Sequence, residues 1–344
     1  LFFFTPTPPY PIPLRLVGSE MCIRDSCVLG AGAFGTALAV ALSKKRNVHL
    51  WGRNIETMNA IDKSRQNSKL PGIQLNSKIN ATADIRSALL DSSLVLCAIP
   101  LQKSRQVLQD AEHLLQGQGL IGCSKGIDIK TGFGGYSTLK NIYSNGPVGI
   151  LTGPSFANDI ARGLPTALTL ASNDSHVLED WQNSLSTDTL RMYISYDPIG
   201  AEIGGALKNV IAIACGAAVG AGLGESARAA LITRGHSEII RYAVTKGARS
   251  ETLAGLSGFG DLCLTCTSDK SRNYLYGLSL SREGKTICHK TVEGSATAQA
   301  MLPILKRLRI DMPITEAVAK ICSKEITVSE AMNNLMARPL KKEL

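Results

Sequence analysis

One lysine stands alone in a small, apolar part of the sequence. The stretch GALKNVIAIACG, residues 205–216, contains a single charge, Lys208. Burying an ammonium group is costly unless the group is paired or used, and desolvation lowers the pKa of a lysine toward neutrality. Gly204, Ala212 and Gly216 recur with it every four residues, so one helix face allows a backbone or ligand to approach closely. We interpret Lys208 as a proton-transfer group; the alternative is a lysine whose amine reaches the surface.

A second polar segment is GLSGFGDLCLTCTSDKSRN, residues 255–273. Its glycines predict a tight loop in which the carboxylate of Asp261 points inward. Ser271, Arg272 and Asn273 then supply a hydroxyl, a guanidinium and an amide in succession. This set suits a phosphate, because an arginine binds two oxygens at once. The alternative is a polar helix start that Ser271 caps.

A glycine-rich turn follows the first short apolar run. In GAGAFG, the residues Gly30, Gly32 and Gly35 fit the pattern G-x-G-x-x-G between a predicted strand and a predicted helix. There the first glycine permits the turn, the second lets a pyrophosphate approach the backbone, and the third lets helix and strand pack closely. The helix N-terminus adds N–H donors. We therefore predict a dinucleotide site; the alternative is a purely structural turn.

The end of the second predicted strand, LWGRN, bears on the choice of cofactor. Sites that prefer NAD usually place an acidic residue there to bind the ribose. This chain has no carboxylate before Glu56, and Arg53 can instead face a 2′-phosphate. We expect NADP(H) to be favoured and NAD(H) to be accepted; the alternative for Arg53 is an ordinary surface arginine.

Three further predicted strands end in residues that can line a ligand, because ligands of doubly wound sheets bind beyond the carboxyl ends of the strands. Pro100 closes one strand, and Lys125 follows another in CSKGI. Gly153 and Ser155 belong to TGPSFA at the end of a third. A lysine at a strand end is usually solvated, but this crevice should also receive the second half of the chain.

Two kinds of predicted structure position these residues. Between residues 27 and 194, short apolar strands alternate with helical segments, which is typical of a parallel, doubly wound α/β sheet of the Rossmann type. From residue 195 to 338, segments rich in Ala and Gly with helical spacing predict an all-α domain. Residues 1–26 are rich in proline, and LVGSEMCIRDS within them resembles the translation of a sequencing-library adaptor. We expect this segment to be a non-native or disordered extension.

Composition excludes several classes of function. The chain has 344 residues, enough for two domains, and its net charge of +9 comes from scattered basic residues, so we expect no nucleic-acid partner. Nine cysteines on a long chain suit reduced thiols. Cys263 and Cys266 form a C-x-x-C without a second pair at zinc spacing, so we expect no metal site. The longest apolar run, residues 210–224, predicts no membrane insertion because it is too short.

Longer strings resemble a known family. GAGAFGTALA, KGI, GPSFA, GALKNVIAIACG, ARAALITRG, GFGDLCLTCTSDKSRN and VEG occur in the order and spacing of the bacterial NAD(P)-dependent glycerol-3-phosphate dehydrogenases, over about residues 27–338. The resemblance implies reversible reduction of dihydroxyacetone phosphate to sn-glycerol 3-phosphate with NAD(P)H, which supplies the glycerol phosphate backbone of phospholipids. It also implies a Rossmann domain, a helical domain and an active site between them, in a cytoplasmic homodimer.

The same resemblance implies roles for individual residues. Lys208 would be the proton donor and acceptor. The residues that would contact the substrate are Lys125, Gly153, Ser155, Asp261, Ser271, Arg272 and Asn273. The residues that would line the cofactor, beside the glycines and Pro100, are Ala33, Phe34, Arg53, Lys125, Ala157, Arg272 and Glu293, the last in a predicted loop. From its position directly after Lys208, we also expect Asn209 to fix a polar group of the substrate.

The sequence departs from the family pattern in three places. Ala33 stands where the family often has Ser, at the expected cost of a phosphate hydrogen bond. Ser226 stands where Asn is usual. Arg24 and Asp25 would fall in a central buried strand, where charges are costly.

Two alternatives to this function remain. One is another β-hydroxyacid-type dehydrogenase of the same architecture, which would not need the phosphate set at residues 271–273. None of the five histidines falls in the motifs above, which weighs against a histidine-based dehydrogenase. The other is a non-catalytic dinucleotide-binding protein, which would need no proton donor such as Lys208.

Overall fold

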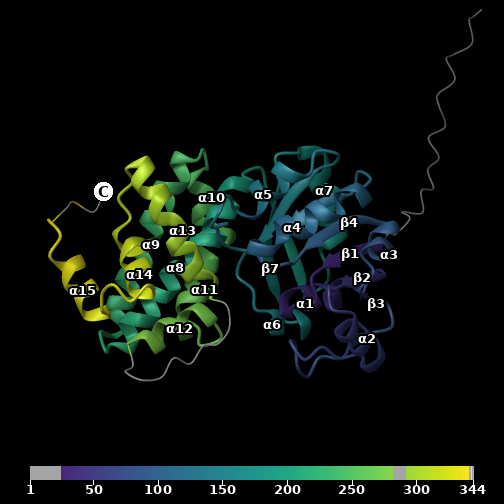
Figure 1. Ribbon diagram of the computed structural model, residues 1–344, viewed down its shortest axis with the longest axis horizontal. Coiled ribbons are helices and arrows are strands. Elements are labelled where there is room, and N and C mark those ends of the chain that lie inside the picture. The colour runs from purple at the N-terminus through teal and green to yellow at the C-terminus, as the bar shows by residue number, and fades with distance from the viewer. Residues whose placement is uncertain (1–24, 282–291, 341, 343–344) are drawn as a thin grey trace, which may run out of the picture.

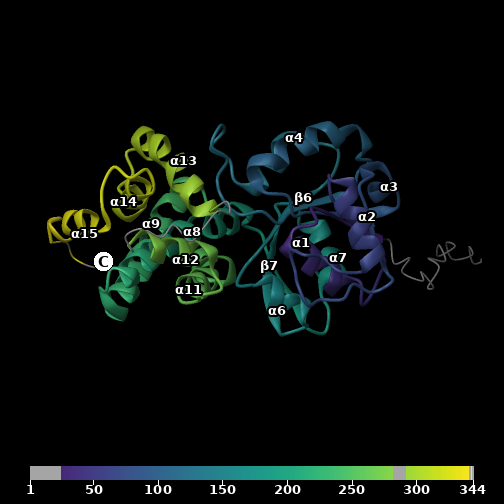
Figure 2. The same cartoon turned by 60° about the horizontal axis from the view of Figure 1, so that its bottom comes forward.

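The computed structural model describes residues 25–281, 292–340 and 342, and these form two lobes that lie side by side (Figures 1 and 2). One lobe contains the strands, and the other consists of helices α8 to α15. The described strands are β1 (Asp25–Leu29), β2 (Val48–Trp51), β3 (Ile79–Thr82), β4 (Ser92–Cys97), β5 (Gly119–Gly122), β6 (Val148–Thr152), β7 (Thr166–Ala171) and β8 (Leu190–Ser195).

The helices of the strand lobe are α1 (Ala33–Leu42), α2 (Ile55–Ser64), α3 (Ile85–Leu90), α4 (Leu101–Ala111), the 3₁₀ turn η1 (Glu112–Leu114), α5 (Gly135–Ile142), α6 (Ala157–Ala161) and α7 (Ser175–Leu185). Those of the helical lobe are α8 (Pro198–Gly220), α9 (Gly224–Thr245), α10 (Ser250–Ala254), the π-helical turn η2 (Leu256–Gly260), α11 (Asp261–Cys266), α12 (Arg272–Leu280), α13 (Glu293–Leu308), α14 (Pro313–Cys322) and α15 (Val328–Met336).

The described strands form one sheet in the order β3-β2-β1-β4-β5-β6-β7-β8. This confirms the doubly wound α/β prediction, but the sheet is not wholly parallel, because β7 is antiparallel to β6 and parallel to β8. The connection from β6 to β7 contains only the five-residue helix α6, which packs against α1. Since α6 does not carry the chain back across the sheet, the chain re-enters from the edge at which β6 ended.

Helices cover both faces of the sheet, as the near-continuous apolar strands require. Successive side chains of a strand point to opposite faces. In β1, Val28 packs into a core with α1, α2 and α7, whereas Cys27 and Leu29 pack into a second core with α3, α4 and α5. The carboxyl ends of the parallel strands therefore meet at one edge, where the predicted ligand site lies.

The start of β1 differs from the prediction of an extension that ends at residue 26. Ser26 lies within the strand and pairs with β2 and β4, while residues 1–24, including Arg24, lie outside the described residues. Asp25 is the first residue of the strand, and its side chain is 22% exposed. Asn47 donates a hydrogen bond to it over 3.3 Å, and His49 Nε2 lies 3.5 Å from its carboxylate. The predicted cost of burying this charge is therefore reduced.

Helix α8 is the core of the helical lobe. It begins at Pro198, upstream of the apolar run 210–224 recognised in the sequence, and ends at Gly220, so the helix is longer than that run. Its 23 residues have the length and hydropathy of a membrane span, but 89% of the most apolar window is buried inside the protein. Its apolar surface is therefore covered by η2 and by helices α9 and α11 to α14.

Candidate active site

The glycine-rich turn has the geometry that a dinucleotide needs. Gly30 has a φ of +121°, and a Cβ there would lie 2.7 Å from the carbonyl oxygen of Ala98. A Cβ on Gly35 would overlap the carbonyl oxygen of Gly30, so only glycine lets α1 pack this close. A Cβ on Gly32, by contrast, would meet no atom within 4 Å. Gly32 is also the N-cap of α1 and forms no side-chain cap, so open space adjoins a helix N-terminus. These features fit a pyrophosphate.

The predicted cofactor residues Arg53, Pro100, Lys125 and Ala157 follow the carboxyl ends of β2, β4, β5 and β6. Arg53 is exposed just before α2, and Pro100 is the N-cap of α4. Ala157 begins α6, and Ala33 and Phe34 are the half-buried first residues of α1. Because these strands are parallel, the residues lie along one edge of the sheet.

Lys208 lies at the centre of a buried ionic cluster. Its Nζ is 2.5 Å from Asp261 Oδ1, and Lys125 Nζ is 2.6 Å from Asp261 Oδ2, so one carboxylate joins two lysines. Asp261 is fully buried, while the side chains of Lys125 and Lys208 are 15% and 7% exposed. Lys125 also donates to the carbonyl oxygen of Gly153 over 3.2 Å. Lys208 is therefore not the surface lysine of the alternative interpretation.

The small residues of α8 explain how this lysine is buried. A Cβ on Gly204 would lie 2.6 Å from the carbonyl oxygen of Ser257 in η2, and a Cβ on Gly216 would overlap the carbonyl oxygen of Tyr274 in α12. Both elements thus pack directly on the backbone of α8. Asp261 follows η2 as the first residue of α11, so the predicted tight loop is helical instead.

Burial sets the electrostatics of Lys208. Desolvation is the largest effect and lowers its pKa from 10.5 to about 8. The carboxylate of Asp261 opposes this shift, and the nearby positive charge of Lys125 adds to it. An ammonium with a pKa of about 8 is close to neutrality, where a group can both release and accept a proton efficiently.

Thr265 belongs to the cluster but was missed from the sequence. Lys208 donates to Thr265 Oγ1 over 2.7 Å, and this hydroxyl donates to the carbonyl oxygen of Asp261 over 2.7 Å. The spacing of four residues between Asp261 and Thr265 on a helix was the one available signal, because such residues share a face.

The predicted phosphate set lies at the start of α12. Ser271 is the N-cap and accepts from the backbone N–H of Tyr274, as the capping alternative expects. Arg272 is exposed, and Asn273 is nearly buried. Asn273 Oδ1 accepts from the backbone N–H of Gly294 over 3.0 Å.

Helices α8, α12 and α13 meet at this point. A Cβ on Gly294 would lie 2.5 Å from the carbonyl oxygen of Asn209 and 2.9 Å from Asn273 Oδ1. The residue before it, Glu293, is the half-buried first residue of α13, so the prediction of a loop there is wrong. Val292 is the N-cap of α13, and the helix begins at Glu293. Its second residue, Gly294, packs against Asn209 of α8 and Asn273 of α12.

The structure does not bring every predicted residue into contact. Among the described residues, no hydrogen bond or ion pair links Arg53, Arg272 or Glu293 to the cluster of Lys125, Lys208 and Asp261. Ser155 lies two residues beyond Gly153 and donates to its carbonyl oxygen over 3.2 Å. The lysine cluster is thus formed by Lys125, Lys208, Asp261 and Thr265 without the exposed residues Arg53 and Arg272.

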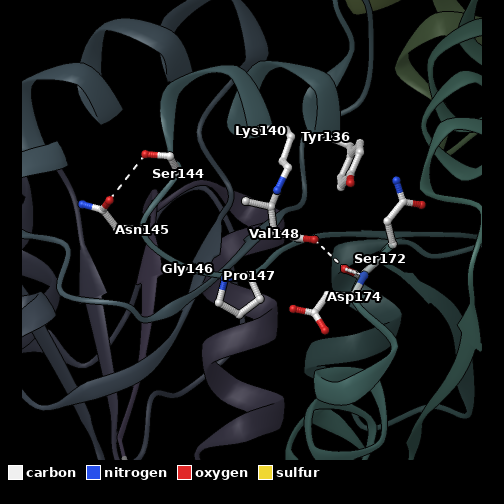
Figure 3. A pocket seen from close by; sticks show the side chains of 10 residues that line it. Tyr136, Lys140, Ser144, Asn145, Gly146, Pro147, Val148, Ser172 and Asp174 are labelled. Atoms are coloured by element: carbon white, nitrogen blue, oxygen red, sulfur yellow. Dashed lines mark hydrogen bonds between the residues drawn. The ribbon is translucent and has the colours of Figure 1, made fainter.

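A separate polar cavity of about 320 Å³ lies between α5 and the start of α7 (Figure 3). Tyr136 and Lys140 of α5 face it, and Ser172 donates to the carbonyl oxygen of Val148 at its base over 2.6 Å. None of the residues that line it belongs to the predicted site. This cavity is therefore not part of the cluster around Lys208.

The C-x-x-C pair of Cys263 and Cys266 lies in α11. Cys266 is fully buried and Cys263 half-buried, and both are free thiols. Within residues 25–281, 292–340 and 342, no group of three or more His, Cys, Asp or Glu side chains could hold a metal ion. Burial raises the pKa of both thiols, so neither is an activated nucleophile.

Comparisons with known proteins agree with this arrangement. Residues 25–178 match the model of the NAD-dependent glycerol-3-phosphate dehydrogenase N-terminus, and residues 197–333 match that of its C-terminus. The chain is 49% identical over 317 residues to a glycerol-3-phosphate dehydrogenase [NAD(P)+] of Ruegeria sp. (strain TM1040), covering 92% of this chain and 99% of the relative.

Solved structures show the same likeness. The crystal structure of glycerol-3-phosphate dehydrogenase from Coxiella burnetii superposes with a TM-score of 0.87 at 32% identity, over 92% of this chain and 99% of that one. A probable 2-dehydropantoate 2-reductase from Bacillus subtilis shares the fold alone, with a TM-score of 0.60 at 14% identity over 87% of this chain and 99% of that one. The chain therefore belongs to the NAD-dependent glycerol-3-phosphate dehydrogenase family.

Proposed function

We propose that this protein catalyses the reversible, NAD(P)H-dependent reduction of dihydroxyacetone phosphate to sn-glycerol 3-phosphate. The observation that carries the proposal is the buried cluster in which Asp261 joins Lys125 and Lys208 over 2.6 and 2.5 Å. Lys125 comes from the cofactor edge of the sheet, and Lys208 comes from the core of the helical lobe. The cluster thus joins the predicted nucleotide side of the site to the predicted substrate side.

In this proposal Lys208 is the general acid for reduction and the general base for oxidation. A bound NAD(P)H supplies the hydride that reaches the ketone carbon. Of the three N–H bonds of the Lys208 ammonium, two have acceptors among the described side chains, in Asp261 and Thr265. The third can donate to the carbonyl oxygen of the substrate and transfer its proton as negative charge grows there.

Lys125 supports the same step electrostatically. Two ammonium groups and one carboxylate leave the buried cluster with a net positive charge when all three are ionised. A fixed positive charge in a site with little water stabilises a developing alkoxide more than it would in bulk solvent. Asp261 holds both amines in place before the substrate arrives, so the donors need no reorganisation during the reaction.

We propose that the phosphate of the substrate is bound at the start of α12. The hydroxyl of Ser271 can still donate its hydrogen, and the amide nitrogen of Asn273 can donate because only its oxygen bonds to Gly294. Arg272 adds a bidentate donor. Gly153, Ser155 and Asn209 are assigned to the rest of the substrate. Binding energy at the phosphate then positions the carbonyl.

The cofactor is assigned to the glycine-rich turn and the adjoining strand ends. Gly30, Gly32 and Gly35 would hold the pyrophosphate, and Arg53 would face a 2′-phosphate, which favours NADP(H). The remaining assigned lining residues are Ala33, Phe34, Pro100, Lys125, Ala157, Arg272 and Glu293.

We further propose a nucleotide-binding unit of residues 27–194, a substrate-binding unit of residues 195–338, and a homodimer that works in the cytoplasm. The free thiols among the described cysteines support a reducing compartment. Size-exclusion chromatography with light scattering tests the dimer, and a monomeric mass would contradict it.

The function is tested by following NADPH oxidation with three candidate substrates. The ratio kcat/KM for dihydroxyacetone phosphate should exceed that for dihydroxyacetone and for a 3-keto acid by at least about 10³-fold, because the site is built to bind a phosphate. Equal turnover of a 3-keto acid would favour the β-hydroxyacid alternative. Nucleotide binding without turnover of any ketone would favour the non-catalytic alternative.

A further inference from the structure

Glu202 of α8 reaches out of the helical lobe and caps a helix of the strand lobe. Its residue is 7% exposed, and its Oε2 accepts from the backbone N–H of Ser137 over 2.8 Å. Its Oε1 accepts from the hydroxyl of Ser137, also over 2.8 Å. Helix α5, which contains Ser137, has Gly134 as its N-cap and therefore no cap of its own. A carboxylate from another part of the chain fills that position, where the helix dipole favours a negative charge.

The sequence of α5 is adapted to this contact. A Cβ on Gly134 would overlap the side chain of Glu202, so glycine is what leaves room for the carboxylate. Ala201, the neighbour of Glu202, packs in the same core as Tyr136 and Leu139 of α5. The first turns of α8 are thus embedded in the strand lobe, although the rest of the helix is the core of the other lobe.

Of the two helices that Glu202 joins, α8 carries Lys208, and α5 directly follows the segment that carries Lys125. The segment between β5 and α5 contains Lys125 and leads directly into the N-terminus of α5. Lys208 lies six residues after Glu202 on α8. Gly205, between them, faces Lys125, because a Cβ there would lie 3.7 Å from Lys125 Cγ. A shift of α5 against α8 would therefore change the distances from the amines of Lys125 and Lys208 to the carboxylate of Asp261.

The segment that carries Lys125 is itself held firmly, so it can transmit such a shift. Asp128 Oδ1 accepts from the backbone N–H groups of Lys130 and Thr131 over 3.1 and 2.8 Å. Gln102 donates to the carbonyl oxygen of Ile127 over 2.8 Å and accepts from the N–H of Ile129 over 3.2 Å. The other end of this segment leads into α5, and there the chain is held by the hydrogen bonds between Ser137 and Glu202.

We propose that Glu202 is a positioning residue, which ties the start of α5 to α8 and thereby sets the placement of Lys125 relative to Lys208. The proposal rests on the roles proposed above for the two lysines. Burying this carboxylate without a cation is costly, and within the described residues no ion pair includes it. The ionisable groups that its charge affects are Tyr136 and Tyr242. A site that carries such a cost is expected to have a compensating role.

The chain contains a matched control in Glu238 of α9. This residue is 3% exposed, and its carboxylate accepts from the N–H groups of Ile314 and Thr315 and from the hydroxyl of Thr315, over 2.7, 3.1 and 3.0 Å. It thus caps α14 as Glu202 caps α5. Both α9 and α14 lie within the helical lobe, and neither carries a residue of the lysine cluster.

The test compares Glu202→Ala, Glu202→Gln and Glu238→Ala in the full-length protein. Both alanine variants should lose stability. We expect kcat for dihydroxyacetone phosphate to fall at least about tenfold in Glu202→Ala, with the Kd for NADPH within twofold of wild type, and to stay within twofold in Glu238→Ala. Glu202→Gln should retain most of kcat, because an amide can still accept the Ser137 N–H. If Glu202→Ala does not fold, Gly134→Ala displaces the same carboxylate and should lower kcat in the same way.

Hydrogen exchange gives a readout that does not depend on turnover. Exchange should accelerate across residues 124–139 in Glu202→Ala and remain at the wild-type rate there in Glu238→Ala. If the wild type did not reduce dihydroxyacetone phosphate, the proposed function would fail, while this exchange result would still decide whether Glu202 holds the Lys125 segment. Unchanged exchange there, a folded Glu202→Ala with kcat within twofold of wild type, or an equal loss of kcat in Glu238→Ala would each overturn the proposal.

Discussion

Replacing Asp261 by Asn removes the one carboxylate that compensates two buried ammonium groups. Breaking a buried ion pair by removing one partner typically costs about 3–5 kcal/mol, because the other charge remains buried and uncompensated. Lys125 is 15% exposed and Lys208 is 7% exposed, so Lys125 can recover part of its hydration. We therefore expect the lower end, about 3 kcal/mol, which is a large share of a typical unfolding free energy of about 5–15 kcal/mol.

The matched variant is Lys208→Met, which keeps the length of the side chain but removes its charge. In that variant Asp261 retains its ion pair with Lys125 at 2.6 Å and is not left uncompensated. Urea denaturation should therefore show Asp261→Asn to be clearly less stable than Lys208→Met. An equal or smaller loss in Asp261→Asn would show that the carboxylate does not hold the two amines as the structure indicates.

The same substitution should move the pH dependence of catalysis. Asp261 favours the protonated form of Lys208, whose pKa is about 8 in the intact cluster. Without that carboxylate the pKa of Lys208 should fall further, so that less of the acid is protonated at neutral pH. The alkaline limb of kcat/KM for reduction should then shift to lower pH. A limb that stays near pH 8 or moves upward would refute the assignment of Lys208 as the acid.

Four other predictions follow from particular side chains. Lys208→Ala should lower kcat by about 10²–10⁴-fold while NADPH still binds; near-normal turnover would refute its role. Arg53→Ala should weaken the binding of NADPH in a fluorescence titration more than that of NADH, and equal losses would rule out a contact with the 2′-phosphate. Ser26 Oγ is buried without a hydrogen-bond partner among the described residues, so Ser26→Ala should raise the free energy of unfolding by about 1 kcal/mol; a less stable variant in urea would contradict this. Burial raises the pKa of both Glu202 and Glu238 from 4.5 to about 7, so the stability they contribute is present below 4.5 and is lost as pH rises through 7. The double variant Glu202→Gln, Glu238→Gln should remove this loss, on the order of 3 kcal/mol per carboxylate, from the pH dependence of unfolding, and curves parallel to wild type would contradict it.

Local patterns predicted much of the fold. The glycine-rich turn could be predicted from the sequence because its strand, turn and helix lie within one short segment. Gly35 packs against Gly30 in that segment, and Gly30 packs against Ala98 just after the adjoining strand β4. The helical segments between residues 195 and 338 were recognised from their spacing for the same reason. The short strand β3 was missed, because INAT has neither the length nor the apolar run that marks a strand.

The direction of β7 could not be read from its residues. Strand propensity is the same for parallel and antiparallel pairing, and the difference lay in the path of the connection through α6. The start of α13 was also predicted wrongly. Glu293 is the first residue of this helix, and the helix start packs against α8 and α12, a contact that the local sequence does not show.

The sequence by itself identified Lys208, because a lone charge in an apolar helix is visible without coordinates. It also placed Lys125 and Asp261 in their own motifs, but it did not show that one carboxylate binds both amines. Lys208 and Asp261 come from α8 and α11 of the helical lobe, and Lys125 follows a strand of the other lobe, so their distances depend on the packing of α8 on α11 and of one lobe on the other. The same two kinds of packing decided the contacts of Thr265 with Lys208 and of Glu202 with Ser137, because these partners are distant in the sequence.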